Sequence, residues 1–226
     1  MKKLVITGML LVIVQVTHAQ HINNVFAFKT EKKHSMMLNL ELDPALFWGI
    51  TYNRGFDVKL GSFERRLIGQ IGWKTFQFNY NDLNLNFQTT LVPKQVKPNV
   101  IVNFGAENKY LENKVHQANI YNWVVSMMPG YFKERWYIGT ELLYKWLFRA
   151  KYDHTDFYKE IYPEVVDDEW YSYKNAYWNF SLNVGARLSK QVDFDVRAGY
   201  RFSSDFSNYQ PYIQPYFGDL AINFRF

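Results

Sequence analysis

Long stretches of the chain alternate between apolar and polar residues, which is the spacing of a β-strand and not of a helix. The clearest stretch runs over residues 135–151, where Trp136, Ile138 and Leu142 share one face with other apolar residues, and Glu141 and Lys145 lie on the opposite face. The pattern predicts an all-β fold of ten strands. Eight strands remain the alternative if residues 36–42 form a tail and another weak segment is not a strand. Strong alternation also covers residues 175–188, 192–202 and 220–226, and weaker alternation covers residues 36–42, 46–53, 67–74, 83–88, 99–107 and 120–127.

Alternation alone does not say whether the apolar face meets a protein core or lipid. This face is dense in Trp, Tyr and Phe near the segment ends, while the polar face carries Asn, Gly, Arg and charges of both signs. Several segments are longer than the roughly 5–6 residues of an ordinary strand and reach the roughly 9–11 residues of a tilted membrane strand. These features predict an antiparallel up-and-down transmembrane β-barrel with a polar interior. A secreted, calycin-like soluble barrel with an apolar interior remains the alternative.

The connections between the predicted strands differ in length. Residues 61–65, 93–98, 130–134 and 189–191 form short connections, whereas residues 108–116, 153–171 and 203–211 form longer ones. Short turns at one end and longer loops at the other are typical of outer-membrane barrels. We therefore expect the short turns on the periplasmic side.

Composition narrows the class of protein. The 226 residues include 7 Trp, 17 Tyr, 19 Phe and no cysteine. A chain this aromatic is not disordered, and a chain without cysteine has no disulfide, thiolate metal site or cysteine nucleophile. The mean hydropathy of −0.32 argues against a bundle of membrane helices.

The N-terminus has the pattern of a secretory signal peptide. Met1-Lys2-Lys3 is followed by an apolar run from Leu4 to Val16 and by small residues before a predicted cleavage at Gln20. An uncleaved anchor is the alternative, although the run is short for a membrane span. Cleavage removes two lysines, so the formal charge falls from +5 to +3, which does not suggest a nucleic-acid partner. We expect a signal peptide over residues 1–19, a periplasmic tail over 20–35 that could enter the barrel mouth, and a barrel over 36–226.

The last segment carries a family resemblance. The alternating Leu220, Ile222, Phe224 and Phe226, together with the signal peptide and the other strands, resemble small outer-membrane β-barrel proteins of Gram-negative bacteria. The resemblance implies an outer-membrane location among lipid and lipopolysaccharide, and a C-terminal signal at these four residues that is read by the barrel-assembly machinery. It leaves the activity open, because such barrels include inert anchors, adhesins, lipid-modifying enzymes and narrow channels.

Charged residues lie on the face predicted to line the barrel. They must pair, because isolated burial costs several kcal/mol per ion. A three-residue turn over 189–191 would place Arg187 opposite Asp193 and Arg197 opposite Asn183. A plug of ion pairs and a selectivity ring are both compatible with this face, and a barrel of eight to ten strands is narrow enough to favour the plug. The predicted interior network comprises Glu141, Lys145, Arg149, Arg187, Asp193, Asp195, Arg197 and Arg201, with Glu41, Lys74, Glu107 and Arg225 on the same face.

The connection 153–171 is acidic and interleaved with aromatic residues. Its carboxylates could hold a divalent cation directly or bridge to lipopolysaccharide phosphates, but the spacing of a calcium-binding EF-hand loop is absent. The alternative is a solvated surface loop that recognises an extracellular protein or glycan. The loop residues singled out are Asp153, His154, Asp156, Glu160, Glu164, Asp167, Asp168 and Glu169.

No sequence motif links the residues that could act in catalysis. A lipid-acting barrel enzyme would need a serine, a histidine and an acidic residue near the outer rim. His116, His154, Ser172, Ser203 and Ser204 are the candidates. We expect no cofactor and a structural or surface-interaction protein with a side-chain-filled interior. A narrow channel or small-solute transporter and a lipid-acting enzyme remain alternatives.

Overall fold

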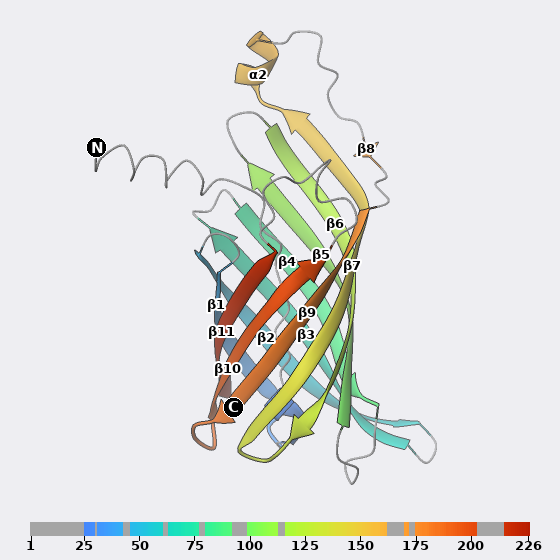
Figure 1. Cartoon of the computed structure of the whole chain (residues 1–226), viewed down its shortest axis with the longest axis vertical. Coiled ribbons are helices and arrows are strands. Elements are labelled where there is room, and N and C mark those ends of the chain that lie inside the picture. The colour runs from blue at the N-terminus through green and yellow to red at the C-terminus, as the bar shows by residue number, and fades with distance from the viewer. Residues whose placement is uncertain are drawn as a thin grey trace, which may run out of the picture.

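The chain folds into a closed barrel of antiparallel strands (Figure 1). The computed structural model describes residues 25–29, 31–42, 46–60, 63–76, 80–91, 99–112, 116–161, 170–171, 175–202 and 215–226. The predicted signal peptide over 1–19 therefore lies outside the described residues. The described elements are η1 (Val25–Lys29), β1 (His34–Leu42), β2 (Leu46–Leu60), β3 (Phe63–Phe76), β4 (Tyr80–Thr90), β5 (Asn99–Glu112), β6 (His116–Phe132), β7 (Trp136–His154), α2 (Asp156–Ile161), β8 (Trp170–Tyr171), β9 (Asn175–Arg187), β10 (Val192–Phe202) and β11 (Tyr216–Arg225).

The predicted number of ten barrel strands is confirmed. Each strand pairs with its neighbour along the chain, except that β7 pairs with β9, and the first and last strands, β1 and β11, pair to close the barrel. The two-residue β8 pairs with Ala150 and Lys151 near the end of β7 and is an addition to the wall. No helix in the described part of the chain is long and apolar enough to span a bilayer.

The two ends of the barrel differ. We call the end that carries the β2–β3, β4–β5, β6–β7 and β9–β10 connections and residue Phe226 the turn end, and the opposite end the loop end. The β9–β10 hairpin has the expected register, with Arg187 opposite Asp193 and Arg197 opposite Asn183. The expected long connection over 108–116 is wrong, because β5 continues to Glu112 and β6 begins at His116.

The side chains divide cleanly between the two faces of the wall. Leu182, Phe180 and Leu220 point outward and are 46–48% exposed, whereas Arg197 and Lys145 point inward and are 1–2% exposed. Outward apolar side chains recur on every barrel strand that the structure describes, so the outer surface suits lipid and not water. This arrangement is opposite to that of a soluble calycin-like barrel, whose apolar side chains face inward.

A bulge in β7 changes which residues face inward. Tyr121 of β6 lies opposite Arg149 and Asn122 lies opposite Leu147, so Phe148 has no residue opposite it in this pairing. The extra residue shifts the alternation, and Ala150 becomes fully buried while Arg149 is exposed on the outer face. Our expectation that Arg149 lies in the interior network therefore differs from the structure.

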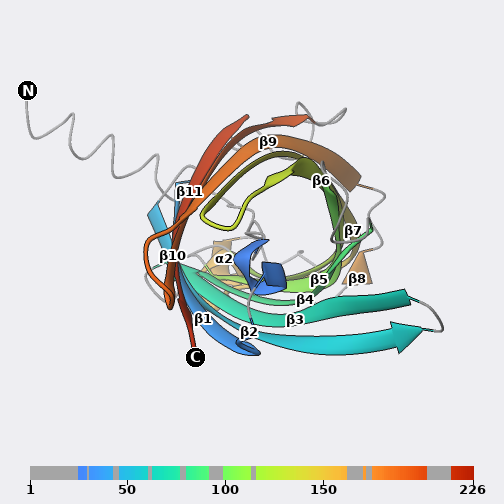
Figure 2. The same cartoon turned by 90° about the horizontal axis from the view of Figure 1, so that it is seen from below.

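The N-terminal element lies inside the barrel. Seen from the turn end, η1 occupies part of the barrel interior (Figure 2). Val25 and Phe26 are 1–2% exposed and pack in one cluster with Ile101, Met128 and Phe132. Part of the segment expected as a periplasmic tail is thus part of the folded barrel.

Candidate functional site

A layer of charged side chains crosses the middle of the barrel, and we call it the charge layer. Every member is at most 5% exposed. The members come from strands around the whole wall, because alternation directs one residue in two toward the interior. The cationic members are Lys74, Lys109, Lys145, Arg197 and Arg201, and the acidic members are Glu41, Asp82, Glu107, Glu141 and Asp219, so their formal charges cancel.

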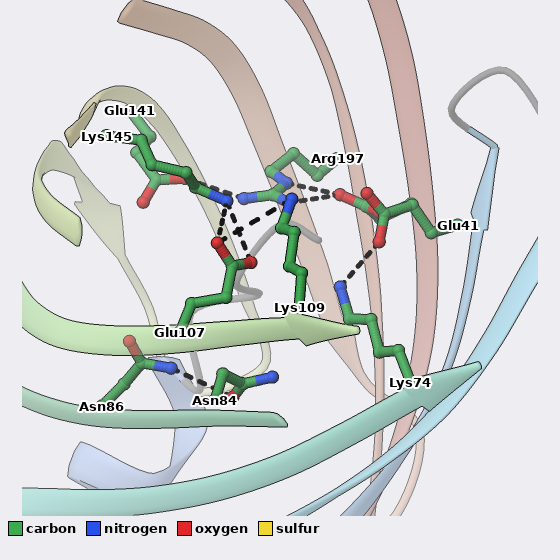
Figure 3. Close-up of polar contacts among 10 residues, drawn as sticks. Glu41, Lys74, Asn84, Asn86, Glu107, Lys109, Glu141, Lys145 and Arg197 are labelled. Atoms are coloured by element: carbon green, nitrogen blue, oxygen red, sulfur yellow. Dashed lines mark hydrogen bonds and ion pairs between the residues drawn. The ribbon is translucent and has the colours of Figure 1, made fainter. Parts of the chain in front are cut away.

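Lysine–glutamate pairs form one side of the charge layer (Figure 3). Lys74 Nζ lies 2.6 Å from Glu41 Oε2. Lys145 Nζ lies 2.7 Å from Glu107 Oε2, and Lys109 Nζ lies 3.8 Å from the same oxygen. Asn122 donates a further hydrogen bond of 3.1 Å to Glu107. These contacts supply the partners that a buried charge needs.

Arg197 of β10 connects the other side of the layer. Its Nε donates to Asp219 Oδ2 on β11 at 2.6 Å, and its Nη1 lies 3.3 Å from Glu141 Oε2 on β7. Glu141 also accepts a bond of 3.5 Å from Ser181 on β9. One guanidinium therefore links three strands of the wall through two of its nitrogen atoms, and its planar fork holds the donors in fixed directions.

Aromatic rings cover the cations on the loop-end side of the layer. The guanidinium of Arg201 lies 5.4 Å from the Tyr177 ring and 5.7 Å from the Phe217 ring, and Arg197 lies 5.5 Å from Phe217. Lys145 Nζ lies 5.8 Å from Tyr177. These cation–π contacts add to the ion pairs and fill the space between them.

Glycines on the inner face make room for these large side chains. A Cβ at Gly199 would overlap the ring of Phe217, and a Cβ at Gly185 would overlap the ring of Tyr137 and the carboxyl group of Asp195. The neighbouring side chains thus lie flat against the wall where a glycine exposes the backbone. The interior around the charge layer is packed with side chains.

A second charged group lies nearer the turn end, and we call it the turn-end cluster. Arg225 Nη2 donates to Asp193 Oδ1 at 2.9 Å, and Arg187 Nε lies 3.7 Å from the same carboxyl oxygen. The Tyr137 hydroxyl donates to Asp195 Oδ1 at 2.8 Å. Apart from Arg149, the residues of the predicted interior network thus fall into two groups: Glu141, Lys145, Arg197 and Arg201 in the charge layer, and Arg187, Asp193 and Asp195 in the turn-end cluster.

Three members of the charge layer were missed in the sequence. Asp82, Lys109 and Asp219 lie just beyond the strand limits that the alternation predicted. The alternation could have identified them, because Asp82 is two residues from Asn84 and Lys109 is two residues from Glu107, which puts each on the same face as its neighbour. Extending each segment by one or two residues would have placed all three inside.

The acidic loop is described in part. Asp153 lies in β7 next to its last residue, and its carboxylate lies 3.2 Å from Lys151 Nζ. Asp156 and Glu160 are exposed on α2. Within the described residues, no group of three or more acidic or histidine side chains is placed to hold a metal ion. Four of the singled-out loop residues lie outside the described part: Glu164, Asp167, Asp168 and Glu169.

The residues considered for catalysis and assembly are placed as follows. The backbone of His116 lies opposite that of His154, and Ser172, Ser203 and Ser204 lie outside the described residues.

Leu220, Ile222, Phe224 and Phe226 all point outward and are 40–56% exposed. The four residues of the expected assembly signal therefore share the lipid-facing side of the final strand.

Comparisons with known proteins return barrels. No protein-family model and no curated protein matches the chain. Among solved structures, the chain is similar to the KdgM porin, with 11% identity, 85% of this chain and 99% of that chain covered, and a TM-score of 0.43. It is also similar to the outer membrane protein Omp33 of Acinetobacter baumannii, with 8% identity, coverages of 86% and 98%, and a TM-score of 0.36. A third is Ail, the attachment invasion locus protein of Yersinia pestis, with 12% identity, coverages of 86% and 99%, and a TM-score of 0.28. At such low identity, the similarity concerns the barrel architecture alone.

Proposed function

We propose that this small outer-membrane β-barrel is a closed structural anchor that presents its loop end for surface interaction. In this proposal the turn end faces the periplasm, residues 1–19 direct export, and outer-membrane lipid surrounds the apolar wall. This role requires no cofactor and no catalytic residue. The closed interior and the exposed loop end are the two parts of this function.

The burial of the charge layer is the observation that carries the proposal. A water-filled channel would leave its lining side chains accessible, as in barrels wide enough to conduct. Here Arg197, Lys145 and Glu141 are 1–2% exposed although they lie in the middle of the barrel. Ion pairs and aromatic rings occupy the space that a solute would need.

The loop end offers the surface for interaction. Strand β7 pairs with β9 as far as Leu147 and continues to His154, and α2 follows at its tip (Figure 1). Phe157 and Ile161 lie one helical turn apart on α2 and are 58% and 53% exposed. Carboxylates of Asp156 and Glu160 flank them on the same short helix. This combination suits a protein partner with an apolar contact residue and basic side chains around it.

Two measurements test the proposal. Purified protein inserted into planar bilayers should give no steady conductance above that of protein-free bilayers. A steady open current would contradict the closed interior. For the surface role, whole cells carrying the wild-type protein should bind a basic, apolar-tipped peptide, and Phe157→Ser with Ile161→Ser should abolish that binding. Equal binding by the double variant would reject the α2 surface.

A further inference from the structure

The short helix η1 occupies part of the barrel interior near the turn end (Figure 2). Phe26 is 1% exposed, and its ring meets the Tyr137 ring edge-on with centroids 5.4 Å apart. Val25 and Phe26 pack in one apolar cluster with side chains from β5, β6 and β7, namely Ile101, Met128, Phe132 and Tyr137. An apolar element from the chain's N-terminal part thus occupies the place where a solute would enter.

Arginines from the wall hold η1 on both sides. The guanidinium of Arg187 lies 5.3 Å from the Phe26 ring. Arg66 donates from Nη1 to the carbonyl oxygen of Ala27 at 3.1 Å, and Asp57 fixes Arg66 at 3.0 Å. Each of these contacts is a single cation–π or hydrogen-bond interaction, which can be exchanged for water when η1 leaves.

The connection from η1 to the wall is short. Residues 30–33 join η1 to β1, and the Lys33 carbonyl oxygen accepts a bond of 2.7 Å from the Gly55 amide. A fully extended chain spans at most about 3.3–3.6 Å per residue. The helix could therefore leave the interior and reach the rim, but it would stay beside the mouth and could return.

The seat of η1 is separate from the charge layer. The apolar cluster and the charge layer share no residue, and the Tyr137–Asp195 hydrogen bond lies at the edge of the seat. We infer that Val25–Lys29 is a tethered stopper that closes the turn end, and that it forms a second barrier in series with the charge layer. Passage through the barrel requires both barriers to open.

Thiol protection tests the stopper directly, because the chain has no cysteine of its own. Met128→Cys places a thiol in the seat, where the native side chain is fully buried. In folded protein in detergent micelles, this thiol should resist a small maleimide, and Phe26→Ala or deletion of residues 25–29 should remove the protection. Lys33→Ala, an exposed change in the connection, is the matched control and should keep it. Equal reactivity with and without Phe26 would overturn the inference.

Conductance tests the two barriers. The second barrier is weakened by Arg197→Ala with Asp219→Ala, which removes the Arg197–Asp219 ion pair and leaves Glu141 with its hydrogen bond from Ser181. We expect the bilayer current to stay at its baseline when residues 25–29 are deleted alone. The same result is expected when Arg197 and Asp219 are changed alone. A variant that carries both the deletion and the paired change should conduct. Current from the stopper deletion alone, or a silent combined variant, would contradict two barriers in series. Folding of each variant is checked by the shift in gel mobility between unboiled and boiled samples.

The outcomes separate this inference from the proposed function. Conductance by the wild-type protein would reject the closed anchor. Protection of Met128→Cys depends on η1 alone and would still report whether the stopper exists.

Discussion

Lys145 of β7 forms a 2.7 Å ion pair with Glu107 of β5, although β6 lies between these strands in the sheet. The pair therefore reaches across the concave inner face of the wall. Two long side chains that meet in this way fill the interior and also neutralise each other. A double-mutant cycle tests the pair. Lys145→Met and Glu107→Gln should each destabilise the barrel, and their effects should be non-additive by about 0.5–3 kcal/mol.

The cycle is measured by urea unfolding in lipid vesicles, followed by tryptophan fluorescence. Additive effects within error would show that the two groups do not interact. Lys109, at 3.8 Å from the same oxygen, offers a weaker comparison pair.

Arg197→Met should lower the free energy of unfolding by about 3–5 kcal/mol, because Asp219 and Glu141 would lose a buried cationic partner. Arg149→Met is the matched control, since the β7 bulge places Arg149 on the outer face. A surface change of this kind should stay within about 0.5 kcal/mol. A similar loss of unfolding free energy in both variants would contradict the placement of Arg197 inside the barrel and Arg149 on its outer face.

Gly199→Ala should destabilise the barrel by about 1–3 kcal/mol, because its new Cβ would overlap the ring of Phe217. The control is Gly218→Ala, where the nearest atom to a new Cβ is the Arg197 carbonyl oxygen at 3.7 Å. Thermal unfolding of both variants in the same detergent makes the comparison. Unchanged thermal stability of Gly199→Ala would show that the interior beside Phe217 is not tightly packed.

Leu182→Arg tests the lipid-facing side of the wall. Leu182 lies at the middle of the outward row of β9, and an arginine at the bilayer midplane costs about 2–4 kcal/mol. Leu188→Arg, at the turn end just after β9, should cost about 0–1 kcal/mol because it lies near the interface. The unfolding free energy in vesicles distinguishes them. Equal tolerance in both positions would argue against a membrane around this face.

Phe226→Ala tests the expected assembly signal. Phe226 stacks on the His34 ring with centroids 6.1 Å apart, and its amide donates to the His34 carbonyl oxygen at 3.0 Å. We expect less barrel in the outer membrane of cells and unchanged folding of purified protein in detergent. Tyr216→Ala changes an exposed aromatic at the other end of β11 and should assemble normally. If Phe226→Ala assembles normally, Phe226 is not part of an assembly signal.

Alternation predicted the wall well because a barrel strand has two environments on its two faces. The number of strands, the β9–β10 register and the outward side of Leu220 all follow from period-two spacing and a turn length. Strand limits were harder, because β5 continues through Asn108 and Tyr110, which are polar or amphipathic where apolar residues were expected. The missed residues of the charge layer follow from these limits.

The position of Arg149 could not be read from alternation, because a bulge inserts one residue without a sequence signal as clear as glycine. The partners on the inner face also depend on contacts between strands that are not paired with each other, such as β7 and β10. Arg197 meets Glu141, which is 56 residues away along the chain, and no local spacing announces such a pair. The insertion of η1 is equally hidden from local spacing, since its seat combines side chains of the three strands β5, β6 and β7.

The cancelling charges of the layer constrain how this protein can diverge. An outward leucine such as Leu182 can be exchanged for another apolar residue with little effect on its neighbours. An inward member such as Lys145 cannot lose its charge without depriving Glu107 of its nearest cationic partner and unbalancing the layer, so a tolerated change must be matched by a second change on another strand. Divergence of the interior should therefore proceed by coupled substitutions between strands, while the lipid-facing positions drift independently.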